Sequence, residues 1–166
     1  LTRRGVAVGD RFAVMMGNHP EFVEAAVAAS LLGAVFVPID PRTRGAKLAF
    51  VLRNAGCAGL ICADSCLPAV EAVRTEVPDL RWILALETGE AEPTPRDVAG
   101  VEPLAEILAG PTPSLDPRAE PTSPLQIMCS TALPPHPPTP MTLMTAPSDD
   151  VCSMISTLVF YCLLSG

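Results

Sequence analysis

The sequence predicts an α/β fold whose βαβ units form a mainly parallel sheet. Between residues 11 and 86, short apolar runs of strand length alternate with segments whose apolar residues have helical spacing. The apolar runs lack polar alternation, as is typical of parallel strands that are covered on both faces. Strands that alternate with helices in this way are joined by right-handed crossovers, so consecutive strands run parallel.

The first βαβ unit is expected over residues 11–37. A strand at 11–16 (RFAVMM) follows the turn pair Gly9-Asp10, and a second strand is expected at 34–37 (AVFV). The helix between them begins near Pro20, whose fixed φ suits a first helical turn, and ends at Gly33 as a C-cap. Apolar residues at i, i+3 and i+4 spacing give this helix one face for packing: Phe22, Ala25, Ala26, Ala29 and Leu32.

The same alternation continues to residue 86. A helix over 46–55 stops at Gly56, and a strand follows at 59–63 (GLICA). A third helix over 68–77 is ended by Pro78, and a fourth strand is expected at 81–86 (RWILAL).

Beyond Glu87 the composition changes, because 14 of the 19 prolines lie between Pro93 and Pro147. Proline fixes φ and has no N–H, so little regular structure is expected over 111–147. Before that segment, a short helix is expected over 101–109. The apolar run at 151–164 is shorter than the roughly 20 residues that cross a bilayer. A buried strand is favoured there, ahead of an exposed aggregation-prone segment.

Three divisions of the chain follow. Residues 1–110 are expected to form an α/β subdomain, residues 111–147 an irregular Pro-rich segment, and residues 148–166 an apolar C-terminal segment with a short strand. The chain opens at Leu1, within what reads as a loop feeding a strand, which favours a fragment of a larger protein.

Composition excludes several classes of partner. A net charge of −7 with only 11 basic residues argues against nucleic acid and anionic membranes. The first ten residues contain no secretory signal, so the six cysteines are expected to be reduced thiols of a cytoplasmic protein. Cys62 and Cys66 lie four positions apart, but no second pair of ligands completes a zinc site, so no metal site is expected.

One stretch of the chain has its short motifs in the same order as a known family. The segments GDR, FAVMM, GN and PEF lead into LLGAVFVPIDPRTRGAKLAFVLRNAGCAGLICA. This order resembles the AMP-forming acyl-CoA synthetases, a family of adenylate-forming ligases, well over residues 5–86 and loosely over 101–131. The resemblance implies the N-terminal part of an acid–CoA ligase. In intact relatives a carboxylic acid attacks Mg-ATP to give an acyl-adenylate, and coenzyme A then displaces AMP.

The family's phosphate loop follows a short apolar strand and reads roughly [YF]-[ST]-[ST]-G-T-T-G-x-P-K-G. Its glycines and N–H groups cradle the phosphates of ATP, and its lysine adds positive charge. By position, Cys129 takes the place of the aromatic residue, and Ser130 and Thr131 take the two hydroxyl positions. These two hydroxyls are the candidate ATP-binding remnant. The plainer interpretation makes them ordinary hydroxyls that end a strand.

The loop pattern then breaks. The chain continues ALPPHPP over 132–138, has no glycine between Ser130 and Ser165, and has no lysine after Lys47. Proline has no N–H to offer a phosphate, so this loop is expected not to hold ATP. The chain alone is therefore expected to be inactive, with no catalytic residue and no ATP, Mg²⁺ or coenzyme A bound.

No other catalytic constellation can be assembled from the sequence. His19 suits a cap or surface position, Asp40 suits a turn, and Glu71 and Arg74 suit a surface pair. The alternatives are a non-catalytic α/β fragment that binds a partner, a pseudogene-like product, and an unrelated nucleotide-binding domain. A dinucleotide-binding domain is disfavoured because no GxGxxG follows the first strand.

A genetic accident that shifted or excised a stretch of coding sequence between Thr131 and about Ser148 would explain the broken loop, and true divergence is the alternative. Codons GGC-ACT-ACC-G for Gly-Thr-Thr, less one G, become GCA-CTA-CCG, which encode the observed Ala132, Leu133 and Pro134. We predict that sequencing the coding DNA will reveal a Gly-Thr-Thr-Gly reading in a neighbouring frame at this point. A well-supported single frame without that hidden reading would exclude the hypothesis.

Overall fold

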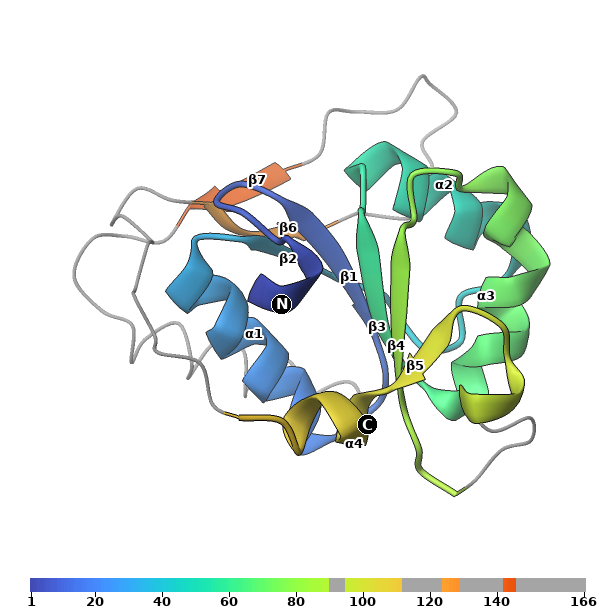
Figure 1. The fold of residues 1–166 in the computed structure, drawn as a ribbon. Coiled ribbons are helices and arrows are strands. Elements are labelled where there is room, and N and C mark those ends of the chain that lie inside the picture. Colours follow the sequence, from blue (N-terminus) through green and yellow to red (C-terminus); the bar gives the residue numbers. More distant parts are fainter. Residues whose placement is uncertain (90–94, 112–123, 129–141, 146–166) are drawn as a thin grey trace, which may run out of the picture.

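Figure 1 shows the computed structural model, which describes residues 1–89 and 95–111, together with the backbone of 124–128 and 142–145. In the described chain, strands form one sheet in the order β5-β4-β3-β1-β2-β6-β7. All neighbouring strands run parallel except β6 and β7, which are antiparallel. The strands are β1 (Arg11–Met15), β2 (Val35–Pro38), β3 (Gly59–Ala63), β4 (Trp82–Leu86), β5 (Val101–Pro103), β6 (Pro124–Met128) and β7 (Thr142–Thr145). The sheet is therefore mainly parallel, as predicted.

Helices cover both faces of this sheet. The helices are α1 (Pro20–Leu32), α2 (Gly45–Ala55), α3 (Leu67–Val73) and α4 (Leu104–Leu108). Short 3-10 turns accompany them: η1 (Thr2–Arg4), η2 (Asp64–Cys66), η3 (Arg74–Glu76) and η4 (Pro95–Asp97).

The strand order decides which helix lies on which face. The chain moves one way along the sheet from β1 to β2, and then the opposite way from β2 through β3 to β4. Because the crossovers are right-handed, reversing the direction moves the connecting helix to the other face. Figure 1 accordingly shows α1 on one side of the sheet and α2 with α3 on the other.

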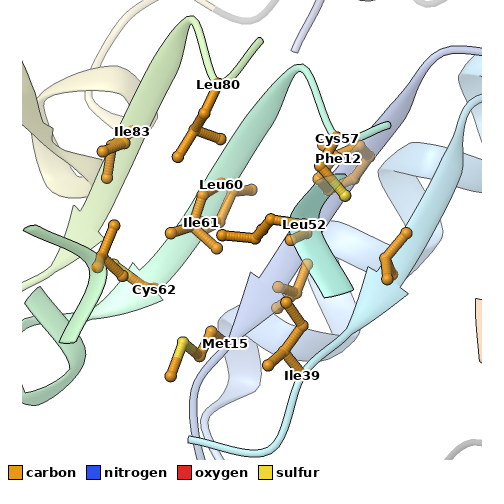
Figure 2. Packing of buried hydrophobic residues seen from close by; sticks show 14 of the residues in the cluster. Phe12, Met15, Ile39, Leu52, Cys57, Leu60, Ile61, Cys62, Leu80 and Ile83 are labelled. Carbon is orange, nitrogen blue, oxygen red and sulfur yellow. The ribbon is translucent and has the colours of Figure 1, made fainter. Parts of the chain in front are cut away.

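The core lies around β1 and β3. Phe12, Ala13, Val14 and Met15 are fully buried, and every residue of β3 is buried. In Figure 2, Leu52 of α2 points toward β1 and β3 and lies close to the β3 side chains. These strands are covered from both faces, which explains their continuous apolar sequence.

The glycine caps predicted for the first two helices are confirmed. Gly33 follows α1 with φ 66° and donates its N–H to the carbonyl groups of Ala29 and Ser30. Only glycine adopts this left-handed conformation without strain, and it satisfies carbonyl groups that the helix leaves open. The next residues turn directly into β2, where the Val35 N–H donates to the Asp10 carbonyl at 2.8 Å.

Three details differ from the predictions. The third helix is shorter than expected, because α3 ends at Val73 and continues only as the η3 turn. Pro78 disfavours helical backbone at the residue before it, and Val77 is indeed non-helical at φ −125°. The helix predicted over 101–109 begins only at Leu104, since Pro103 ends a short strand that pairs with β4.

The third detail is that two short strands, β6 and β7, lie inside the Pro-rich segment. They occupy stretches with few prolines, and only the first residue of β6 is a proline. That position does not need a ladder donor. The apolar strand predicted at 151–164 lies outside the described residues.

A glycine in β3 makes room for the tryptophan of β4. Gly59 is paired with Trp82 on one side and with Phe12 on the other. A Cβ built at Gly59 would lie 1.9 Å from Cε2 of the indole, so the ring occupies the space above the glycine. The rings of Phe12 and Trp82 have centroids 6.2 Å apart. Among the described side chains, buried Trp82 Nε1 has no hydrogen-bond acceptor, so packing alone holds the ring.

Replacing Gly59 by alanine is therefore expected to destabilise the fold. The added methyl group must displace the indole ring, and overpacking of this kind costs roughly 1–3 kcal/mol. Urea unfolding followed by Trp82 fluorescence measures the loss. Gly17→Ala is the matched control, because nothing lies within 4 Å of a Cβ there. Equal stability of the two variants would contradict the packing argument.

Candidate functional site

The carboxyl ends of the parallel strands define the candidate site. In open α/β sheets, ligands bind outside these ends, at the point where the strand order reverses. Here β1 has β2 on one side and β3 on the other, so this point lies between the carboxyl ends of β1 and β3. The loops over 16–19 and 64–66 follow these two strands.

Strand β6, which precedes the degenerate phosphate-loop sequence, ends at this same edge. Strand β6 runs parallel to β2, with Phe36 opposite Gln126, so Met128 ends β6 at the edge where β2 ends. Strand β6 therefore precedes the loop position, as in the family pattern that the chain resembles, although little regular structure was predicted for this segment. Ser130 and Thr131 lie outside the described residues, so their role as an ATP-binding remnant stays a prediction.

Asp64 is the most fully engaged polar side chain at this edge. It follows β3 directly and is 2% exposed. Its Oδ1 accepts hydrogen bonds from the Ser65 N–H at 2.8 Å and the Thr88 hydroxyl at 2.6 Å. Its Oδ2 accepts from the N–H groups of Thr88 at 2.8 Å and Gly89 at 3.2 Å. The carboxylate thus joins the end of β3 to the loop after β4.

These hydrogen bonds also decide the ionisation of Asp64. Burial raises the pKa of the Asp64 carboxyl, because it disfavours the charged form. The hydrogen bonds from Thr88, Ser65 and Gly89 stabilise that charge and outweigh burial, so the pKa lies below its ordinary value of 3.8. A carboxylate with every acceptor position engaged has a structural role and is poorly suited to accept a substrate proton.

Sequence reasoning missed this interaction, although a signal for it is present. Asp64 directly follows the strand at 59–63, and Thr88 lies two residues after the strand at 81–86; these strands were predicted to be consecutive and parallel. Polar residues at the carboxyl ends of such neighbours meet at one edge of the sheet, so the two positions could have been paired.

Asp40 occupies the turn that was predicted for it. Its Oδ1 accepts from the Arg42 N–H at 2.8 Å and from Arg42 Nε at 3.0 Å, and its Oδ2 accepts from Arg42 Nη2 at 2.8 Å. The hydrogen bonds from the Arg42 side chain and backbone lower the pKa of Asp40 to about 2. The pair is largely exposed, so it stabilises a turn and leaves Asp40 without the properties of a general base.

The cysteines near this edge are buried thiols. Cys62 lies in β3 and Cys66 lies in η2, and neither is in a disulfide. Burial raises the pKa of both thiols, with smaller contributions to Cys62 from Cys66 and Asp64. The Cys66 thiol lies 3.7 Å from the carbonyl oxygen of Pro41. Buried protonated thiols of this kind are poor nucleophiles and pack as small apolar groups.

His19 and Arg74 are two other residues that the sequence analysis considered. His19 occupies the N-cap position of α1, but its side chain makes no capping hydrogen bond. Arg74 Nη1 lies 2.8 Å from Glu71 Oε1, as predicted for a surface pair, and it also donates to the Ala99 carbonyl at 2.8 Å. The second bond ties α3 to the segment before β5.

The described residues do not fit a magnesium–nucleotide complex. No group of three or more His, Cys, Asp or Glu side chains in the described chain could hold a metal ion. Asp64 and Asp40 are both engaged by protein donors, so neither offers a free carboxylate to Mg²⁺. At this edge the described side chains organise the ends of the strands.

The parallel sheet with helices on both faces defines a doubly wound α/β unit. Its strand β6 precedes the position of the family's phosphate loop. Over residues 1–151 the chain matches the family of AMP-binding enzymes. It is 37% identical over 76 residues to the long-chain-fatty-acid–CoA ligase FadD13 of Mycobacterium tuberculosis, covering 46% of this chain and 15% of that ligase. It is 34% identical over 87 residues to a long-chain-fatty-acid–CoA ligase of Thermus thermophilus, covering 52% of this chain and 16% of that ligase.

Solved structures agree on the fold. The anthranilate CoA ligase AuaEII, in complex with anthranoyl-AMP, superposes with a TM-score of 0.64 at 21% identity, over 76% of this chain and 23% of that chain. The Mycobacterium tuberculosis fatty acyl CoA synthetase superposes with a TM-score of 0.57 at 27% identity, over 78% of this chain and 24% of that chain.

The chain belongs to the AMP-binding enzyme family, the AMP-forming synthetases and ligases. It spans about 15% of the length of the long-chain ligases to which it is similar. Within the described chain, no helix is long and apolar enough to cross a membrane.

Replacing Asp64 by asparagine is expected to destabilise the protein markedly at pH 7. The amide turns an NH₂ group toward backbone donors that then lack an acceptor, and an unsatisfied buried group costs about 1–3 kcal/mol. The wild-type stabilisation from Asp64 is present above its unfolded pKa and is lost as the pH falls through the lowered folded pKa. Urea unfolding between pH 7 and pH 2 should therefore show a weaker acid dependence in Asp64→Asn.

Asp40→Asn is the matched control at the same edge. The pKa of Asp40 is also lowered, but its side chain is 48% exposed and its partner Arg42 is 85% exposed, so solvent screens their interaction. A much smaller loss of stability is expected. If Asp40→Asn destabilised the protein as strongly as Asp64→Asn, burial would not be what distinguishes the two carboxylates.

Proposed function

We propose that this chain is the N-terminal part of an AMP-forming acyl-CoA ligase that activates a carboxylic acid with ATP. In the complete enzyme, the acid attacks the α-phosphate to give an acyl-adenylate and pyrophosphate, and coenzyme A then displaces AMP. The family match over residues 1–151 carries the proposal, supported by the parallel pairing of β2 with β6, which leads into the phosphate loop.

We further propose that this chain does not catalyse the reaction by itself. In place of glycine, threonine and lysine, the loop has Ala132, Leu133 and a run of prolines. A proline-rich loop has few N–H groups to surround a triphosphate, and electrostatic stabilisation of phosphates is central to such chemistry. Ser130 and Thr131 would be left as hydroxyl groups without the rest of their cradle. Asp40 and Asp64 offer no free carboxylate to the Mg²⁺ of Mg-ATP, because protein donors engage both of them.

The proposed substrate class is a carboxylic acid, and the proposed setting is cytoplasmic. Relatives at 34–37% identity are named for long-chain fatty acids, whereas a solved neighbour at 21% identity holds an aryl adenylate. The similarity covers the scaffold, so it does not separate acyl from aryl acids.

The buried thiols of Cys62 and Cys66 agree with a reducing compartment. The divisions proposed for the whole chain remain 1–110, 111–147 and 148–166, although β6 belongs to the sheet of the first division.

Calorimetric titration with Mg-ATP tests this proposal. The purified chain is expected to fold, as judged by circular dichroism, and to release no binding heat, because the loop has lost its glycines and its lysine. The long-chain ligase of Thermus thermophilus, titrated under the same conditions, is the positive control. Clear micromolar binding to the chain would contradict the proposal. Ser130→Ala and Thr131→Ala would then be the first variants to measure.

A further inference from the structure

Helix α2 presents an aromatic side chain at the centre of its water-facing side. The buried residues of α2, which turn toward the sheet, are Leu48, Ala49, Val51, Leu52 and Ala55. With the helical repeat, Phe50 lies opposite the middle of this buried side. Phe50 is 45% exposed, and it is the aromatic member of the exposed large apolar side chains in the described chain. A helix that packs on one side only normally has polar residues at such a position.

Basic residues flank Phe50 on this side of the helix. Lys47 and Arg53 lie three positions before and after Phe50, so both share its side of α2, and both are exposed. Helix α2 contains no acidic residue. The α2 outer face is defined here by the exposed residues Ala46, Lys47, Phe50, Arg53 and Asn54. Figure 1 shows α2 and α3 as the layer that covers one face of the sheet, with this side turned outward.

The charges around the α2 outer face leave it positive. Residues 40–56 contain the cations Arg42, Arg44, Lys47 and Arg53 and one carboxylate, Asp40. Glu76 adds a second carboxylate, whose Oε2 lies 3.5 Å from Arg53 Nη1. Four cations and two carboxylates give this region a net charge of +2, in a chain whose net charge is −7. The region therefore favours a negatively charged partner.

The neighbouring elements do not change this balance. On α3, Glu71 Oε1 lies 2.8 Å from Arg74 Nη1, so these two charges compensate each other. The loop between η3 and β4 contains Asp79 and Arg81, which again have opposite charges.

We propose that the α2 outer face docks an acidic amphipathic helix of a partner protein. Ala46, Phe50 and Arg53 follow i, i+4 and i+7 spacing, by which one helix packs along another, and Lys47 and Asn54 lie beside this line. Phe50 is the apolar anchor, since aromatic side chains are enriched in the centres of protein interfaces.

The two basic residues determine the charge of the partner. Lys47 and Arg53 are placed to pair with carboxylates on either side of an apolar stripe. The ion pair between Arg53 and Glu76 is about half exposed on both sides, with side-chain exposures of 49% and 50%. Exposed pairs contribute little to stability, so Arg53 can exchange Glu76 for a carboxylate of the partner at small cost.

Other occupants fit this surface less well. Two α2 outer faces from two copies of the chain would bring like charges together, because the helix has no carboxylate of its own. Nucleic acids and anionic membranes are bound by longer cationic clusters, without carboxylates among them. The inference goes beyond the proposed ligase function and requires no nucleotide.

Fluorescence anisotropy with two labelled peptides tests the docking surface. Both peptides are helical, are about 16 residues long and have a leucine stripe. The first has glutamates beside the stripe, and the second has glutamines at the same positions. The folded chain is expected to bind the glutamate peptide about tenfold more tightly at low salt, and to lose this preference as the ionic strength rises. Phe50→Ala is expected to weaken binding of the glutamate peptide by about tenfold or more.

Val27→Ala is the matched control. Val27 is 39% exposed, close to the exposure of Phe50, but it lies on α1, on the opposite face of the sheet and three residues after Glu24. Its replacement is expected to leave binding unchanged within about twofold, because Val27 lies outside the proposed surface. Circular dichroism checks that each variant folds.

Several outcomes would overturn the proposal. It fails if the folded wild-type chain binds neither peptide, if it binds both equally, or if Phe50→Ala and Val27→Ala weaken binding equally. Tighter binding of a DNA oligonucleotide or of phosphatidylglycerol vesicles would assign the surface to a polyanion instead. Self-association that Phe50→Ala abolishes, without peptide binding, would assign it to a second copy of the chain. Titration of the same preparations with Mg-ATP tests the proposed function separately.

Discussion

The burial of β1 between β2 and β3 is the constraint on which the rest of the structure depends. Phe12 to Met15 are fully buried, and β1 pairs in parallel with a neighbour on each side. A parallel strand in that position needs a helical layer on each face of the sheet. Right-handed crossovers supply both layers, because the chain passes first to β2 and then back across β1 to β3. The placement of α1 opposite α2 and α3 follows from this one reversal.

The same reversal determines what the carboxyl edge of the sheet can do. It brings the ends of β1 and β3 together, where α/β proteins commonly bind ligands, and it leaves β2 free to pair with β6. Within the described residues, however, this edge is closed by internal interactions. Asp64 joins β3 to the loop after β4, and Asp40 is held by Arg42. The described part of this edge therefore has a structural role. Beyond Met128, the sequence lacks the glycines and the lysine of the family's phosphate-loop pattern.

Much of this architecture could be predicted from local sequence. Gly33 and Gly56 end helices because they adopt left-handed conformations, and Pro20 starts one, so these boundaries were predictable from single residues. The packing of Trp82 against Gly59 and the hydrogen bonds between Thr88 and Asp64 were not predicted, because each depends on which strands become neighbours. Strand β5 was mistaken for part of a helix, since three residues give no clear period and their pairing with β4 is a tertiary effect. For the candidate site, the loop position was predictable, and its residues Ser130 and Thr131 lie outside the described chain.

Hydrogen–deuterium exchange with and without Mg-ATP tests the central claim most directly, namely that the ligase scaffold persists although nucleotide binding is lost. We expect slow exchange of the amides of β1 and β3, since both are buried in the sheet, and no change when Mg-ATP is added. Rapid exchange throughout β1 and β3 would contradict a folded scaffold. Protection that appears only with Mg-ATP, in the loops over 16–19 or 64–66, would contradict the loss of nucleotide binding.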